Sequence, residues 1–310
     1  MVPDPRHVNG LTYRGSGTLA KEFNFEECLI FLDRSSLEVL HKIQEGSVYK
    51  LIKIEESLIL CQIGFTHHVI RVEFPVGKPS IYFRQKAVEY IWEWFDLDQD
   101  LEAFYEVANQ DQVLKNLAHK YYGLRIMCIP DLFEALVWAI MGQQINLTFA
   151  YTLKKRFVEQ FGESLTFEGE TFWLFPSYEK IASLSVDDLR NLQFTSRKAE
   201  YIIGIAKAMA KGELSKEILL QNKDFIKIHQ SLLMMRGIGP WTADYVMMKC
   251  LHIPSAFPVS DVGLHNALKN FIGLERKPTI EEVKEYAVNW EGWQAYATFY
   301  LWRSLYDKNT

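Results

Sequence analysis

The sequence predicts an α+β protein in which a small mixed β-sheet domain at the N-terminus precedes a larger, all-helical domain. Two observations support this prediction. Up to about residue 80, apolar residues alternate with polar ones, as in half-buried strands, and from about residue 84 they recur at helical spacings of three and four. At 310 residues the chain exceeds the usual size of a single core, so we expect two domains, residues 1–85 and 86–310.

The N-terminal part contains two strand-like stretches, residues 51–64 and 68–75, which are rich in β-branched and apolar residues. Glycines and prolines around them mark turns. The neighbouring stretch SSLEVLHKIQEG, residues 35–46, is predicted to be a short helix that ends at Gly46.

The remainder of the chain is predicted to be a series of helices without an internal repeat. Asp131 and Pro240 are residue types that begin helices, and Gly142 and Gly237 are of the type that ends them. The predicted helices lie near residues 86–95, 111–119, 130–142, 146–161, 178–184, 186–192, 196–211, 223–235, 240–251, 262–271, 279–288 and 293–304.

Composition and cysteine use indicate an intracellular protein that does not enter a membrane. The four cysteines form no C-x-x-C pair, which favours a reducing compartment and argues against a disulfide scaffold or a thiolate metal site. No apolar run reaches the roughly 18 residues that span a bilayer. The first ten residues, MVPDPRHVNG, lack the apolar core of a signal peptide.

Charge is unevenly distributed along the chain. The formal net charge of -5 does not suggest a nucleic-acid-binding protein. Residues 89–111 carry eight acids and no Lys or Arg, whereas residues 190–216 carry six bases and two acids. A local basic stripe matters more to a polyanion than the total charge, because salt confines the field to roughly 8–10 Å. The stripe therefore fits a DNA contact, although a solvated helix face would look the same.

The segment LLMMRGIGPWTADYVMMKC, residues 232–250, predicts two helices joined by a tight turn, a hairpin over residues 225–251. Gly237 and Gly239 leave the turn without side chains, and Pro240 suits the first position of the second helix. Unpaired amides and the positive end of the helix dipole then form an anion site that a phosphodiester fits. A plain helical hairpin whose helices cross closely would use the same glycines.

Asp261 stands between the extended stretch FPVS and another predicted helix. An Asp at this place is most often an N-cap, which accepts hydrogen bonds from backbone amides. Such donors also favour the charged form of the carboxylate. A charged carboxylate near a DNA-binding turn could stabilise a developing oxocarbenium sugar or orient a water against it. Capping and catalysis are therefore compatible.

Residues 233–268 resemble the helix-hairpin-helix and Gly/Pro…Asp signature of the base-excision DNA glycosylase (HhH-GPD) superfamily. Residues 133–162, 195–208 and 290–303 resemble its 3-methyladenine DNA glycosylase II branch, and the whole resemblance covers roughly residues 90–305. It implies a monofunctional enzyme that flips alkylated purines from duplex DNA and hydrolyses the N-glycosidic bond, which starts base-excision repair. We expect damaged double-stranded DNA as the partner, and a monomer.

The resemblance also implies roles for individual residues. Asp261 matches the essential aspartate, and Gln143 and Gln144 match the turn that fills the gap left by the extruded nucleotide. Gln144 departs from the family pattern, because the best-known member has an apolar wedge there; an amide can still fill the space. The residues expected to bind DNA in or near the hairpin are Arg197, Gly237, Ile238, Gly239 and Pro240.

No metal is expected at side chains. The carbonyls of Met235 and Ile238 match positions where this hairpin family can hold a monovalent cation. No other cofactor is expected, because the chain has no four-cysteine run that could hold an iron–sulfur cluster.

Trp241 is the most informative departure within the superfamily. Strand-cleaving members have a lysine just after G-x-G-x, whereas this chain has Trp241, and Lys249 lies too far along the helix to replace that lysine. Trp241, Tyr245 and Trp293 suggest an aromatic pocket, because electron-rich rings attract the cationic rings of alkylated purines. Core packing of these rings is the alternative. Two other functions stay open: an 8-oxoguanine-type glycosylase, and a non-catalytic hairpin protein that only binds DNA.

Overall fold

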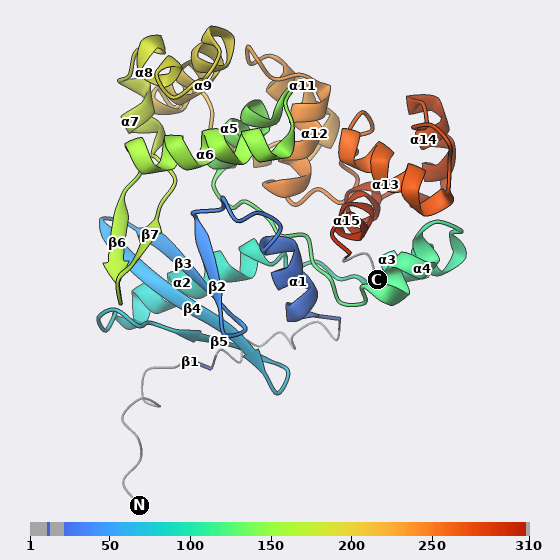
Figure 1. Ribbon diagram of the computed structural model, residues 1–310, viewed down its shortest axis with the longest axis horizontal. Helices are drawn as coiled ribbons and strands as arrows, with labels where there is room; N and C mark the ends of the chain where they lie inside the picture. Colours follow the sequence, from blue (N-terminus) through green and yellow to red (C-terminus); the bar gives the residue numbers. More distant parts are fainter. Residues whose placement is uncertain (1–10, 13–21, 308–310) are drawn as a thin grey trace, which may run out of the picture.

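The computed structural model describes residues 11–12 and 22–307 (Figure 1). An antiparallel sheet lies at one side of the molecule, and the helices stand above and beside it. Residues 1–10, in which the sequence predicts no signal segment, lie outside the described residues. Within the described residues, no helix is both long and apolar enough to cross a membrane.

The sheet has five strands in the order β1-β5-β4-β3-β2. Every neighbouring pair is antiparallel, so the sheet is not mixed as predicted, because short turns join consecutive strands from β2 to β5. The strands are β1 (Leu11–Thr12), β2 (His41–Gln44), β3 (Ser47–Ile54), β4 (Ser57–Thr66) and β5 (Val69–Glu73).

The predicted helix over residues 35–46 is wrong. Its second half forms β2, which pairs with β3 from His41↔Lys50 to Gln44↔Ser47. Glu45 and Gly46 have φ angles of 51° and 73°, the left-handed pair that suits a two-residue hairpin turn. Gly46 therefore belongs to a hairpin and does not end a helix.

The helices predicted from residue 86 onward are present with shifted ends, and three short helices, α1 (Phe25–Leu32), α3 (Glu102–Gln110) and α10 (Lys216–Leu220), were missed. The predicted domain boundary at residue 85 falls inside α2, and that division stays a prediction. The helices are α1 (Phe25–Leu32), α2 (Ile81–Trp94), α3 (Glu102–Gln110), α4 (Leu114–Lys120), α5 (Leu132–Gly142), α6 (Leu147–Phe161), α7 (Tyr178–Ala182), α8 (Val186–Arg190), α9 (Ser196–Ala210), α10 (Lys216–Leu220), α11 (Phe225–Leu233), α12 (Pro240–Lys249), α13 (Val262–Ile272), α14 (Ile280–Tyr286), the 3₁₀ helix η2 (Ala287–Trp290) and α15 (Gln294–Ser304).

A hairpin of two strands, β6 (Ser164–Phe167) and β7 (Glu170–Trp173), interrupts the part predicted to be all-helical. It reaches from the helices to the sheet (Figure 1), where Phe172 packs with Leu51 and Leu60, two residues that face each other on β3 and β4. The other side of these strands faces the main core. Both faces are thus covered at this part of β3 and β4, which explains why adjacent apolar residues such as Leu51 and Ile52 are both buried.

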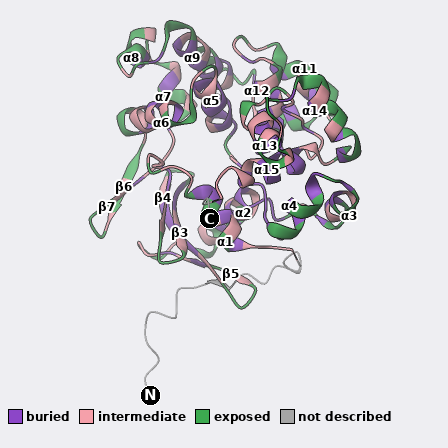
Figure 2. Cartoon of the chain, turned by 45° about the vertical axis from the view of Figure 1, so that its right-hand side comes forward, coloured by how far each residue is buried: buried purple, intermediate pink, exposed green. Residues whose placement is uncertain are grey.

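The buried α5 fixes the position of the hairpin helix α12. Nine residues of α5 are buried, and the helix contacts α6, α9 and α12. Figure 2 shows buried residues along these helices and exposed residues on the outer turns. Because a closely packed core tolerates little displacement, α12 is held against a rigid support.

Candidate active site

The two glycines of the turn between α11 and α12, Gly237 and Gly239, differ in conformation and in surroundings. Gly237 has φ 97°, and a Cβ there would lie 2.3 Å from the ring of Tyr201, so the fold itself requires glycine. Gly239 has φ -94°, and nothing lies within 4 Å of a Cβ built there. Gly239 caps α12, and Pro240 is at its start as predicted. The space before the first turn of α12 is therefore open, as an anion site requires.

The two glutamines that follow α5 differ in their surroundings. The side chain of Gln143 donates to the carbonyl of Gly237 and to Oγ1 of Thr242, both at 3.0 Å, and so ties this turn to the hairpin. Gln144 is exposed and has φ 55°, a left-handed conformation that few residues other than glycine adopt. The structure thus holds Gln143 in place and leaves the side chain of Gln144 in solvent beside the hairpin.

Arg197 is exposed at the second position of α9, and no residue within the described ranges forms a hydrogen bond or ion pair with it. The next residue, Lys198, is buried and donates to the carbonyl of Met141 at 2.8 Å, at the end of α5. The two neighbouring bases therefore have different roles, because only Arg197 keeps its charge available for a phosphate.

Asp261 is the N-cap of α13, as predicted. Its Oδ1 accepts from the amide of Leu264 at 2.7 Å and from Nε1 of Trp302 at 2.8 Å. Its Oδ2 accepts from Nε1 of Trp241 at 2.9 Å. Three N–H groups thus stabilise the negative charge. A carboxylate offers about four acceptor positions, so one remains open on Oδ2.

Three aromatic rings form a row beside Asp261. The rings of Trp241 and Tyr245 are 5.5 Å apart, and those of Tyr245 and Trp302 are 6.1 Å apart, with interplanar angles of 32° and 34°. Tyr245 is 8% exposed, and burial raises the pKa of its phenol. Trp302 was missed by the sequence reasoning, although it lies within the segment 290–303 that carries part of the resemblance.

Trp293 lies elsewhere. Its ring packs against Phe104 and Tyr296, each at 5.9 Å. Nine residues separate it from Trp302, which corresponds to about 13 Å along a helix and to the opposite helix face. The structure therefore does not bring Trp293 to the row of rings at Asp261, and its role in a base pocket stays a prediction.

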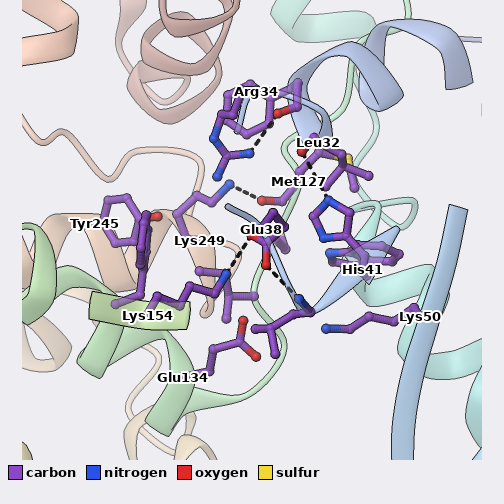
Figure 3. Close-up of a pocket in the computed structure, with 16 residues that line it drawn as sticks. Leu32, Arg34, Glu38, His41, Lys50, Met127, Glu134, Lys154, Tyr245 and Lys249 are labelled. Carbon is purple, nitrogen blue, oxygen red and sulfur yellow. Dashed lines mark hydrogen bonds and ion pairs between the residues drawn. The ribbon is translucent and has the colours of Figure 1, made fainter. Parts of the chain in front are cut away.

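Lys249 ends α12 on the far side of Tyr245, in a cavity of about 50 Å³ (Figure 3). Its Nζ donates to the carbonyl of Met127 and lies 4.8 Å from the ring centre of Phe299. Burial lowers the pKa of this amine to about 7. Lys249 is thus enclosed at the opposite end of α12 from the glycine turn, so its amine is not presented to a nucleotide at Asp261.

The carbonyls proposed for a monovalent cation lie in the same turn. That of Met235 accepts from the amide of Ile238 at 3.1 Å. A carbonyl oxygen has a second lone pair, so this contact leaves room for an ion at Met235. Binding of a cation by Met235 and Ile238 stays a prediction.

The fold and this site are those of a helix-hairpin-helix protein, and comparison with known proteins places the chain in a family. The model of the HhH-GPD superfamily of base excision DNA repair proteins matches residues 137–292, and the model of the 8-oxoguanine DNA glycosylase N-terminal domain matches residues 20–136. A DNA-3-methyladenine glycosylase of Bacillus subtilis is 48% identical over 93% of this chain and 96% of its own length. The chain belongs to the HhH-GPD superfamily of base excision DNA repair proteins.

Solved structures share the fold. The 3-methyladenine DNA-glycosylase of Archaeoglobus fulgidus superposes with a TM-score of 0.79 at 24% identity, over 92% of this chain and 96% of that one. An 8-oxoguanine glycosylase/lyase of Clostridium acetobutylicum, in complex with double-stranded DNA, superposes with a TM-score of 0.71 at 18% identity, over 91% of each chain. The N-terminal sheet and the helical part are thus a combination that occurs in enzymes of two lesion classes.

Proposed function

We propose that this protein is a monofunctional DNA glycosylase that removes alkylated purines of the 3-methyladenine type from duplex DNA. The observation that carries the proposal is the hydrogen bond from Trp241 to Asp261. The indole of Trp241 occupies the position where strand-cleaving relatives have a lysine amine. It donates a hydrogen bond to Asp261, the carboxylate that we expect to stabilise the developing charge on the sugar. The substrate agrees with the name of the Bacillus subtilis relative.

The aromatic row beside Asp261 suits a cationic base. An alkylated purine carries positive charge, and it is attracted to the faces of Trp241, Tyr245 and Trp302. Its charge also makes it a good leaving group, so the N-glycosidic bond can break with both electrons going to the base, without a general acid. The row of aromatic rings therefore selects the lesion by its charge and shape.

Asp261 acts on the sugar. As the base leaves, positive charge develops on the deoxyribose ring, and the carboxylate held by three N–H donors stabilises it. The open acceptor position on Oδ2 can orient a water, whose oxygen bonds to C1′ and whose proton passes to the carboxylate or to solvent. The product is an abasic site in an intact strand.

DNA is held by backbone groups more than by charge. The open space at Gly239 admits a phosphate to the first amides of α12, and Arg197 adds a free guanidinium. Gln144, exposed on its turn, fills the space that the flipped nucleotide leaves. We expect the protein to act as a monomer and inside the cell, where its DNA substrate is.

The match of residues 20–136 to an 8-oxoguanine DNA glycosylase domain favours a second candidate, an enzyme for oxidised guanine. The absence of a lysine at position 241 argues against its lyase chemistry. Base release from matched duplexes that contain 3-methyladenine, 7-methylguanine or 8-oxoguanine separates the two. Release of the methylated purines and not of 8-oxoguanine is expected. The reverse pattern would replace the proposal with the second candidate, and no release from any duplex would leave only a DNA-binding protein.

A further inference from the structure

Asp96, Cys128 and His252 meet at the end of α12 opposite the glycine turn. Asp96 follows α2, Cys128 precedes α5, and His252 follows α12. Nδ1 of His252 lies 2.7 Å from Oδ1 of Asp96 and 3.6 Å from Sγ of Cys128, and the three ligand atoms all lie within 4.8 Å of one another. Asp96 and Cys128 are buried, and His252 is partly exposed.

The spacing of these atoms suits a tetrahedral metal ion. Zinc bonds of about 2.3 Å to sulfur and about 2.05 Å to nitrogen place the two ligand atoms about 3.5 Å apart in a tetrahedron, close to the separation of Sγ and Nδ1. The corresponding oxygen-to-nitrogen separation is about 3.3 Å, so Asp96 has to withdraw by only about 0.6 Å. Thiolate, imidazole and carboxylate together form a donor set that zinc favours over magnesium or calcium.

The side chains that contact the candidate ligands are of the kinds that orient metal ligands in other proteins. Nε2 of His252 lies 3.3 Å from Oε1 of Glu93, the carboxylate–histidine pairing found around zinc. The hydroxyl of Tyr296 donates to Oδ2 of Asp96 at 2.5 Å and leaves Oδ1 to face the histidine. Lys216 makes an ion pair with Glu93 and offsets its charge.

Two of the three candidate ligands have strained backbones. Asp96 has φ 51° and His252 has φ 54°, in the left-handed region that residues other than glycine seldom adopt. Such residues cluster at ligand sites. A groove of about 940 Å³ is lined in part by Glu93, Asp96 and His252, so two of the three candidate ligands border it, whereas Cys128 is buried and is not part of its lining.

We propose that Asp96, Cys128 and His252 bind one zinc ion, with a water as the fourth ligand. Binding releases the thiol proton of Cys128 and the proton at Nδ1 of His252. The ion joins the end of α2 to the segment before α5 and to the end of α12, and it stabilises the support of the hairpin helix. The cysteine spacing could not indicate this site, because His252 is 124 residues from Cys128 and 156 from Asp96.

The test measures zinc directly in the full-length, untagged protein. Protein purified without chelator is expected to contain one zinc per chain by elemental analysis. After chelation, zinc affinity is measured by competition with a coloured indicator. Cys128→Ala and His252→Asn are each expected to weaken zinc binding at least about tenfold. Asparagine is chosen because it tolerates a positive φ. Cys61→Ala, at a buried cysteine of β4, is the matched control and should bind zinc as the parent does.

Cobalt substitution gives a second measurement, and its result for the parent does not depend on how well any variant folds. The parent loaded with Co²⁺ should show a thiolate-to-cobalt charge-transfer band in the near ultraviolet, which Cys61→Ala keeps and Cys128→Ala loses. Zinc at background level in the parent, equal affinity in the parent and both ligand variants, or a cobalt spectrum without the thiolate band would each overturn the proposal. His252 would then only bridge two carboxylates. None of these outcomes bears on base release, because the cluster lies apart from Asp261.

Discussion

Trp302 donates its indole N–H to Oδ1 of Asp261 at 2.8 Å across 41 positions of sequence. Trp241 donates to the other oxygen from a different helix, 20 positions before Asp261. Together with the amide of Leu264, the two indoles give the carboxylate three hydrogen-bond donors, which fix its orientation. An oriented charge of this kind needs no reorganisation when the sugar becomes cationic, which is how electrostatic preorganisation lowers a barrier.

Asp261→Asn is expected to abolish base release while damaged DNA still binds within a few-fold. The amide oxygen can keep the bonds to Leu264 and Trp302, but the NH₂ group then faces the N–H of Trp241. Loss of that charged hydrogen bond should lower the free energy of unfolding by about 1.5–3 kcal/mol. Release assays, DNA-binding titrations and urea unfolding measure the three effects. Activity above a few per cent of the parent would contradict the catalytic role.

Trp302→Phe is expected to lower kcat for base release by about tenfold or more, because it removes one donor to Asp261 and keeps an aromatic ring. KM should change less, since the stacking surface remains. Trp293→Phe, at the N-cap of the same helix and packed against Phe104, is the matched variant and should keep kcat within about twofold. Steady-state kinetics on a methylated duplex measure kcat for both variants. A larger loss of kcat in Trp293→Phe than in Trp302→Phe would show that Trp293 belongs to the base pocket.

Gly239→Val is expected to fold normally and to weaken DNA binding without much change in its salt dependence. The site has an ordinary φ and open space, so the side chain fits but blocks the approach of a phosphate. Gly237→Ala is the contrasting variant: its methyl group meets the ring of Tyr201 and its φ is positive, so thermal stability should fall. Unfolding and DNA-binding curves for both variants test whether Gly239 serves DNA binding and Gly237 serves the stability of the fold. A stable Gly237→Ala, or a Gly239→Val that binds normally, would contradict it.

Arg197→Gln is expected to weaken binding to damaged and undamaged DNA alike and to reduce the log–log salt slope by about 0.9, the value for one phosphate. The parent slope should be shallower than roughly -6 on the same scale, because few free bases stand near the hairpin. Arg276→Gln, at an exposed arginine paired with Glu282, is the control and should leave the slope unchanged. A steeper parent slope would reveal a larger basic surface.

The product is expected to be an intact strand with an abasic site, because Trp241 contacts Asp261 and the amine of Lys249 is enclosed at the other end of α12. A methylated duplex incubated with the protein should break only in the half of the sample that is heated in alkali. Borohydride should trap no covalent protein–DNA adduct. Breaks without alkali, together with a trapped adduct, would show that a lysine attacks the sugar after all.

The sequence by itself determined the features that short-range chemistry controls. Gly237, Pro240 and Asp261 each need only a turn or a helix end to act, so their local conformations could be predicted and are confirmed. Helical periodicity likewise located the long helices, since it reflects one buried face per element. The family follows from the same local motif.

Only the tertiary structure decided which distant residues meet. Residues 35–46 have helical spacing, yet pairing with β3 makes part of them a strand, because burial against a sheet overrides a weak local preference. Trp293 and Trp302 lie in the same segment, residues 290–303, but the packing of α15 brings Trp302 and not Trp293 to Asp261. Asp96, Cys128 and His252 come together for the same reason: side-chain encounters depend on how helices pack, and that information is spread over the whole core.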